Sequence, residues 1–394
     1  MKRFTEKWAA VGLVGLVGLV APACGKDRDL AERPNASGGT STGGVGGAGG
    51  SGGGRGGSAG SSPTGGTAGK YVEPRGRSVT SFFHGIVDAG RVVFCFARHD
   101  EADAVLVGEP QPPGGLAYAA SIALETIDGI DLETTPLLPY VIAGELELVD
   151  GMSCEDAVDK AREEMDAVDK AALGAGGAGG EAGGMGGSGG EAEPPTPPRL
   201  RVAALPEIPA GALTEGYSSL YVAIGCLGGP AFTHPLEGDA CGRGYTPSSP
   251  TSSAVLVTLS RTRVAGMLSL QALHASLASS TLSVFSAPPD TAVQSSVPIG
   301  FDLRRGELKP RQPSPQLTIL DYGVSSPGWR AQASTDGTPF VSERWLNVLE
   351  RAGIDAFVDG RGYTVVVVGP AGNVGSRGFW NDAAIGVVDN DPQL

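Results

Sequence analysis

The sequence has few basic residues and no apolar run of membrane-spanning length near its start. Lysine and arginine total 29 against 43 aspartates and glutamates, for a formal net charge of −14. Nucleic acids and anionic lipid surfaces are bound through clustered Lys and Arg, so this balance argues against both as direct partners. The apolar stretch Trp8–Val20 has roughly 13 residues, whereas a spanning helix needs about 20.

Histidine is scarce as well, and the four histidines form no metal-binding pattern. His84 and His274 occupy equivalent places in two similar stretches, which predicts a shared structural role in two different domains and argues against joint metal ligation. His99 opens an acidic segment, 99–103, that lacks the spacing and glycine of a calcium loop. We read that segment as a solvated acidic turn, and we predict no metal and no other cofactor.

The N-terminus has the proportions of a signal peptide. Met1–Lys7 is basic, a short apolar stretch follows, and Ala21-Pro22-Ala23 stands directly before Cys24. The segment resembles a bacterial lipobox, which implies a signal peptide over 1–23 and lipidation of Cys24. Ala21 and Pro22 depart from the lipobox pattern, and ordinary cleavage after Ala-x-Ala at the same bond is the alternative.

The number of cysteines favours lipidation of Cys24 over ordinary cleavage. The five cysteines are an odd number for an exported protein, and lipidation of Cys24 leaves four for two disulfides. Three pairings of these four are open. We favour Cys226–Cys241, which closes a short loop, together with Cys95–Cys154, which ties an early strand to a helix.

Two glycine-rich stretches have too little apolar surface to offset chain entropy, so we predict that they are disordered. The first makes residues 24–70 a tether on the lipid anchor, and the second is an insertion at 173–198. The tether is similar to those of myxobacterial lipoproteins. Because Gly25 rather than Asp follows Cys24, the enterobacterial sorting pattern implies an outer-membrane lipoprotein that faces the periplasm or the cell surface.

The rest of the chain contains an internal repeat. Phe83–Phe96 and Leu273–Phe285 each show a strand with His near its end and, eight and ten positions later, two apolar residues on one strand face. Gly216–Gly225 parallels Gly362–Gly369, and Ala254 parallels Ala384. The two copies differ by an insertion of the length of Cys226–Cys241.

These openings resemble a family of secreted bacterial domains of unknown function whose first hairpin reads V-H-A-S-P-D-A-P-A-V-D-V-Y. Asp88-Ala89 matches its D-A, and His274-Ala275-Ser276 matches its H-A-S. The prolines and the second aspartate of the pattern are missing from both copies. The resemblance implies an immunoglobulin-like β-sandwich in an extracytoplasmic setting and no reaction.

We therefore predict a mainly β protein with two tandem immunoglobulin-like sandwich domains, 71–262 and 263–394, each with one helix. Ser153 is the expected N-cap of the first helix and Ser342 of the second. The disordered insertion would lie inside the first domain.

No catalytic residue stands out. G-x-S-x-G occurs around Ser51, Ser58 and Ser188, but only within glycine-rich tracts, where no strand and helix build a nucleophile elbow. We therefore favour a non-enzymatic binding or structural module of the cell envelope, with an envelope protein or glycan as partner. The alternative is an envelope-polymer hydrolase that uses acidic residues near Asp100, or Asp128 and Asp131. The aromatic residues Trp329, Trp345, Phe379 and Trp380 are expected to pack in the core, with a recognition surface at 379–382 as the alternative.

Overall fold

The computed structural model describes residues 78–99, 104–127, 130–131, 134–176, 198–213, 217–229, 234–278, 280–287, 297–311, 315–318, 328–372 and 380–392. All of them belong to one compact unit, Thr67–Leu394. The predicted signal peptide, Cys24 and the tether lie outside the described residues, as does 177–197 of the predicted insertion. No described helix combines the length and the apolar character that a membrane crossing requires.

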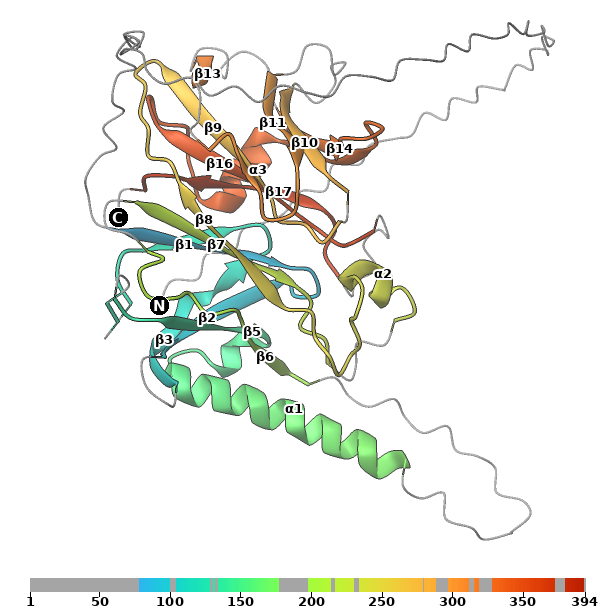
Figure 1. The fold of residues 1–394 in the computed structure, drawn as a ribbon. Helices are drawn as coiled ribbons and strands as arrows, with labels where there is room; N and C mark the ends of the chain where they lie inside the picture. Colours follow the sequence, from blue (N-terminus) through green and yellow to red (C-terminus); the bar gives the residue numbers. More distant parts are fainter. Residues whose placement is uncertain are drawn as a thin grey trace, which may run out of the picture. The chain divides into compact units, whose positions relative to one another are not determined.

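The first half of the unit forms two four-stranded sheets (Figure 1). One sheet has the order β4-β1-β7-β8 and the other the order β3-β2-β5-β6. The strands are β1 Val79–Ile86, β2 Arg91–Arg98, β3 Val105–Ala117, β4 Ser121–Leu124, β5 Leu137–Gly144, β6 Leu200–Ala204, β7 Ser218–Gly225 and β8 Ser253–Leu259. The helical segments are η1 Leu146–Leu148, α1 Cys154–Gly176 and α2 Glu237–Cys241.

The second half repeats this arrangement. Its sheets have the orders β12-β9-β16-β17 and β11-β10-β14-β15, and β13 pairs separately with β9. The strands are β9 Met267–His274, β10 Leu282–Ala287, β11 Val297–Leu303, β12 Leu308–Lys309, β13 Pro315–Thr318, β14 Gly328–Ala333, β15 Pro339–Arg344, β16 Gly362–Val368 and β17 Ala384–Asp389. The helix is α3, Trp345–Ala352.

The strand order is the same in both halves. In each, the first strand pairs in parallel with a later strand, β1 with β7 and β9 with β16. That later strand pairs antiparallel with an edge strand, β8 or β17. The mainly β fold of two sandwich-like groups is therefore confirmed, and the shared order supports the duplication.

The sheets bury their apolar residues in four clusters. One cluster fills the first sandwich around Phe82, Phe94 and Tyr221, and another fills the second around Trp329 and Tyr363. A third joins the two halves sheet to sheet, with Phe83 and Leu220 on one side and Leu273 and Val366 on the other. The strands β1, β7 and β16 are consequently buried on both faces. The fourth cluster lies under α1.

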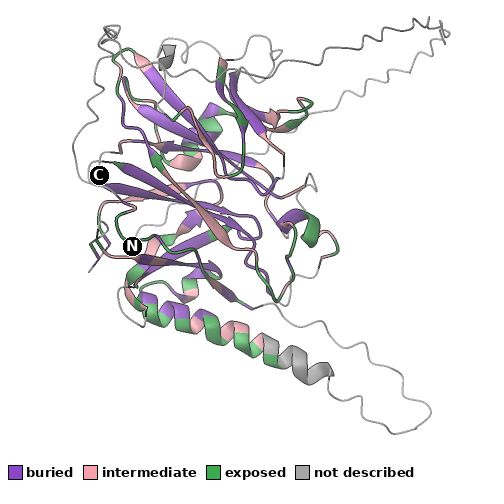
Figure 2. Cartoon of the chain, viewed as in Figure 1, coloured by how far each residue is buried: buried purple, intermediate pink, exposed green. Residues whose placement is uncertain are grey.

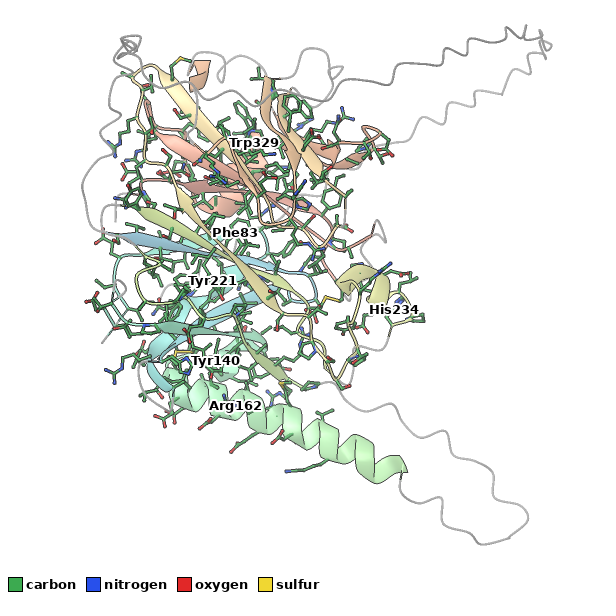
Figure 3. The ribbon with its side chains drawn as sticks, in the orientation of Figure 1. Phe83, Tyr140, Arg162, Tyr221, His234 and Trp329 are labelled. Carbon is green, nitrogen blue, oxygen red and sulfur yellow. A yellow bond between two sulfur atoms is a disulfide. The ribbon has the colours of Figure 1, made fainter. Side chains whose placement is uncertain are left out.

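The helix α1 covers the outer face of the sheet that contains β2 and β5. Ala157, Val158 and Ala161 are fully buried there. Further along, the guanidinium of Arg162 lies 5.6 Å from the ring centroid of Tyr140 in β5 (Figure 3). Ser153 caps the helix as predicted, because its Oγ accepts the Asp156 N–H at 3.1 Å. The helix reaches Gly176, so residues 173–176 of the predicted insertion are helical.

The second helix corrects two predictions. Its N-cap is Arg344 without a side-chain cap, and the predicted cap Ser342 lies within β15. The two helices also occupy different places in the repeat, since α1 follows β5 while α3 follows β15, the counterpart of β6. Their order in the chain, with a helix before β7 and a helix before β16, suggested an equivalence because the short strand β6 went unrecognised.

The register corrects two of the predicted repeat matches. Thr80 lies beside Ser219 and Leu270 beside Tyr363, so Tyr363 corresponds to Ser219 and not to Tyr217 as the sequence comparison suggested.

The second correction is a shift by one residue. His84 lies beside Ala223 and His274 beside Val367, so these two β7 and β16 positions correspond. Ala223 faces Ala254 and Val367 faces Ile385. Ala254 therefore corresponds to Ile385, and not to Ala384 as the sequence comparison suggested.

His84 and His274 make equivalent hydrogen bonds in the two repeats. In each ring Nδ1 accepts the N–H two residues on, from Ile86 at 3.2 Å and from Ser276 at 3.3 Å. Nε2 lies 3.0 Å from the Ala89 carbonyl in the first copy and 3.1 Å from the Ser280 carbonyl in the second. Both rings are fully buried, so each is neutral with its proton on Nε2 and fixes the turn after its strand.

The buried histidines predict a loss of stability in acid. Burial lowers the pKa of His84 to about 3 and that of His274 to about 4, against a weaker opposing effect of their carbonyl partners. The unfolded chain then takes up protons that the folded chain does not, so the stabilisation is complete above pH 6.5 and declines toward pH 4 and 3. In His84→Gln, the slope of unfolding free energy between pH 6.5 and 4.5 should fall by about 1.4 kcal/mol per pH unit. Urea titrations at several pH values measure this, and an unchanged slope would contradict the assignment.

Candidate functional site

A cleft with a volume of about 780 Å³ lies between the two repeats. This is within the usual range of ligand-binding clefts, roughly 300–1,000 Å³. One wall comes from α2 and the start of β8 in the first repeat, and the other from turns of the second repeat around Leu277, Arg305 and Ala371. The lining residues are Ile224, Gly238, Asp239, Cys241, Gly242, Arg243, Thr251, Ser253, Ala254, Val255, Leu277, Arg305, Gly306, Ala371 and Gly372.

A disulfide holds the α2 wall in place. Cys226 and Cys241 are joined, with their Cα atoms 5.6 Å apart. The backbone N–H of Thr251 donates to the Cys226 carbonyl at 3.1 Å, and its hydroxyl donates to the Cys241 carbonyl at 3.2 Å. Across the cleft, the Ala371 N–H donates to the Ala240 carbonyl at 2.7 Å. These bonds fix α2 against both repeats.

The charged groups of the cleft are two arginines and one aspartate. Arg243 comes from the first repeat and Arg305 from the second, and both are exposed. Arg305 donates to the Leu277 carbonyl at 2.6 Å, which positions its guanidinium over the second-repeat wall. Asp239 lies on α2. The remaining lining side chains are apolar or small, so the cleft presents cationic groups beside apolar and small side chains.

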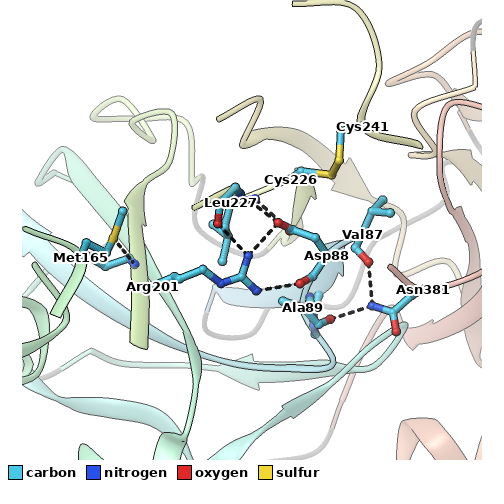
Figure 4. A network of polar contacts seen from close by, with 12 residues as sticks. Val87, Asp88, Ala89, Met165, Arg201, Cys226, Leu227, Cys241 and Asn381 are labelled. Atoms are coloured by element: carbon cyan, nitrogen blue, oxygen red, sulfur yellow. Dashed lines mark hydrogen bonds and ion pairs between the residues drawn. A yellow bond between two sulfur atoms is a disulfide. The ribbon is translucent and has the colours of Figure 1, made fainter. Parts of the chain in front are cut away.

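Behind α2 lies a buried ion pair, Asp88 with Arg201, at 2.7 Å (Figure 4). The Asp88 carboxylate also accepts the N–H groups of Leu227 at 2.8 Å and Gly228 at 2.9 Å. Arg201 donates in turn to the Asp88 carbonyl at 2.7 Å and the Gly228 carbonyl at 2.9 Å. The network therefore holds the turn after β1 against the start of the disulfide loop.

Two further residues, Asn381 and Glu237, lie near the pair of Asp88 and Arg201. Asn381 of the second repeat donates through Nδ2 to the carbonyls of Val87 at 3.0 Å and Ala89 at 2.7 Å, which fastens it to the β1–β2 turn. Glu237 on α2 is buried, and its burial, with a smaller contribution from the Asp88 charge, raises its pKa to about 7.

The structure contains the two disulfides that the sequence analysis favoured. Cys95 in β2 is bonded to Cys154 at the start of α1, and Cys226 to Cys241. Disulfides form and persist in oxidising compartments, so both are consistent with an exported protein.

Of the predicted acidic candidates, Asp131 lies among the described residues. Asp131 accepts a hydrogen bond from the Thr134 hydroxyl at 2.8 Å, a local turn contact, while Asp100 and Asp128 lie outside the described residues. Nδ1 of His99 contacts the carboxylate of Glu207. Within the described part of the chain, no three His, Cys, Asp or Glu side chains form a group suited to a metal ion.

The three tryptophans that were expected to pack in the core lie in the interior. Trp329, Trp345 and Trp380 are all at most 5% exposed, and Phe379 lies outside the described residues. Trp380 packs against the edge of the His234 ring at 5.1 Å. Its burial removes Trp380 from the recognition surface considered at 379–382.

Sequence reasoning missed the cleft residues Arg243, Arg305 and Ala254. The cleft arises where two repeats meet, and no periodicity within either repeat indicates which loops will face each other.

Comparisons with known proteins give little further information. The sequence matches no family model, and no match was found among the curated proteins. One solved structure, of a protein described as "a putative adhesin" from Bacteroides thetaiotaomicron, is similar at 10% identity over 81% of this chain and 100% of that one, with a TM-score of 0.17. At this TM-score the likeness carries no inference about function.

Proposed function

We propose that the chain is a non-enzymatic binding module of the cell envelope, held by a lipid on Cys24. The observation that carries the binding function is the cleft between the repeats, which is preformed and braced by a disulfide. Its described lining includes one carboxylate, Asp239, and no serine or cysteine beside a histidine. A glycosidase-type hydrolase needs two facing carboxyl groups, so this lining favours binding of an envelope protein or glycan over cleavage.

Co-sedimentation tests binding against hydrolysis. Full-length mature protein is mixed with purified cell-envelope material, and both the bound fraction and new reducing ends in the supernatant are measured over time. We expect retention without release of reducing ends. Time-dependent release that is lost in Asp131→Asn would establish the hydrolase alternative instead.

Lipidation rests on the N-terminal sequence and on the cysteine count. Four cysteines are taken up in the two disulfides, which leaves Cys24 as the remaining thiol. Two or three acyl chains on Cys24 would anchor the chain stably, whereas one chain alone gives marginal binding.

Intact-mass analysis of the mature protein, reduced and unreduced, tests the anchor. We expect a chain that begins at Cys24, carries acyl mass there and holds four protected cysteines. In Cys24→Ser, the acyl mass and membrane retention should both disappear. A mature chain that begins at an unmodified Cys24 would support ordinary secretion at the same bond.

A further inference from the structure

The two repeats differ at one equivalent sheet edge. In an antiparallel strand, the N–H and the C=O of a residue point to the same side, alternately toward and away from the paired strand. In β17, the Ile385 N–H donates to Glu343 Oε1 at 2.8 Å, and its carbonyl accepts from Arg351 at 3.1 Å. Glu343 and Arg351 also form an ion pair with each other. The outward-facing groups of Ile385 are thus capped by this pair.

Ala254 is the residue of β8 that corresponds to Ile385, and no described residue caps it in this way. The described residues provide only β7 as a backbone partner for β8. By the register, the N–H and C=O of Ala254 point away from β7, as those of Ile385 point away from β16. The second repeat places α3 beside β17, whereas α1 of the first repeat packs on the other sheet, which contains β2 and β6.

The strand β8 also lacks the usual protection of an open edge. Edge strands are commonly shielded by charged residues, proline or bulges. The sequence of β8, S-A-V-L-V-T-L, has no charge and no proline. Residues 253–257 are half-buried, in contrast to the fully buried β7, and Figure 2 shows the two strands in these different colours. An edge of this kind is a template for another strand.

The cleft lies at the start of this edge. Ser253, Ala254 and Val255 line it together with Arg243 and Arg305. A strand added to β8 would therefore run into a space that offers guanidinium groups. Asp239 offsets one of these charges, which leaves the charged lining with a net positive balance.

We propose that β8 and the cleft bind an extended segment of another protein by strand addition, with an acidic side chain of that segment at Arg243 and Arg305. The proposal rests on the binding function above and specifies its partner. Strand addition gives affinity through main-chain hydrogen bonds and specificity through alternate side chains. A second copy of this chain fits less well, because each copy carries a net charge of −14 and β8 itself has no acidic residue to place at the arginines.

A random peptide library displayed on phage is a suitable probe, selected against immobilised full-length mature protein. Ala254→Pro removes the outward N–H, a position at which an edge strand tolerates proline. Ala254→Ser keeps that N–H and is the matched control. Arg243→Glu combined with Arg305→Glu reverses the charge at two exposed positions. This double variant tests the proposal even if β8 does not tolerate proline. Thermal unfolding of each variant checks the fold.

We expect selected peptides to alternate apolar and polar residues and to be enriched in Asp and Glu. Their affinity should fall by about tenfold or more in Ala254→Pro and in the double charge reversal, which corresponds to about 1.4 kcal/mol or more, and should be kept in Ala254→Ser. Peptides that bind Ala254→Pro as tightly as the parent, or an absence of enriched peptides, would overturn the proposal. A dimer of the parent that Ala254→Pro dissociates would assign β8 to a second copy. Continued co-sedimentation with envelope material in any of these cases would leave the binding function standing.

Discussion

Replacement of Asp88 by alanine is expected to lower the free energy of unfolding by about 3–5 kcal/mol, because it leaves the buried Arg201 cation without its counter-ion. The Arg201 side chain is 7% exposed, so water cannot take the place of the carboxylate. The N–H groups of Leu227 and Gly228 lose their acceptor in the same substitution. Urea unfolding at pH 7 with the disulfides intact measures the effect.

Asp159→Ala is the matched control for Asp88→Ala. Asp159 also forms an aspartate–arginine pair, with Arg162 on α1, but both side chains are more than half exposed. Exposed pairs of this kind contribute little, so the control should unfold nearly as the parent does. Equal effects of the two substitutions would show that the Asp88 network does not hold the turn after β1 against the disulfide loop.

Removal of the Cys95–Cys154 disulfide by two alanine substitutions is expected to cost about 4 kcal/mol, since the bond spans 59 residues of chain. It also fastens the first turn of α1 to β2, and the helix covers that sheet face. Removal of Cys226–Cys241, which spans 15 residues, should cost about 3 kcal/mol. Denaturant unfolding of the two double variants should give this order, and the reverse order would indicate that chain entropy does not govern their contributions.

The strand content and the repeat could be predicted because their signals are local. Period-two apolar residues mark β2 and β10, and the histidine of each opening strand keeps its distance to them. The disulfide pairing was favoured among three because one bond closes a short loop and the other ties a strand to a helix, and the structure contains both bonds. The sheet-to-sheet contact between the repeats was missed, although Y-T-V-V-V-V in β16 is a continuous apolar run of the kind that strands buried on both faces show.

The start of α3, the match of the two edge strands and the role of Gly386 depend on tertiary packing and could not be predicted from the local sequence. Ser342 has the chemistry of an N-cap, but pairing of β15 with β14 extends the strand beyond it. The one-residue register shift between Ala254 and Ile385 arises because both edge strands begin with small residues. Gly386 is fixed by the interface as well, since a Cβ atom there would collide with the Phe83 ring of the other repeat. Its counterpart in the first repeat, Val255, faces the cleft.

Hydrogen–deuterium exchange of the unliganded full-length protein tests most directly the central claim, that the repeats present one capped and one open edge. The amide of Ile385, which donates to Glu343, should exchange slowly, while that of Ala254 should exchange much faster. Glu343→Ala, which removes the acceptor, should speed exchange at Ile385 and leave Ala254 unchanged. Equal protection of the two amides in the unliganded protein would contradict the account, because it would mean that the edge of β8 is already occupied.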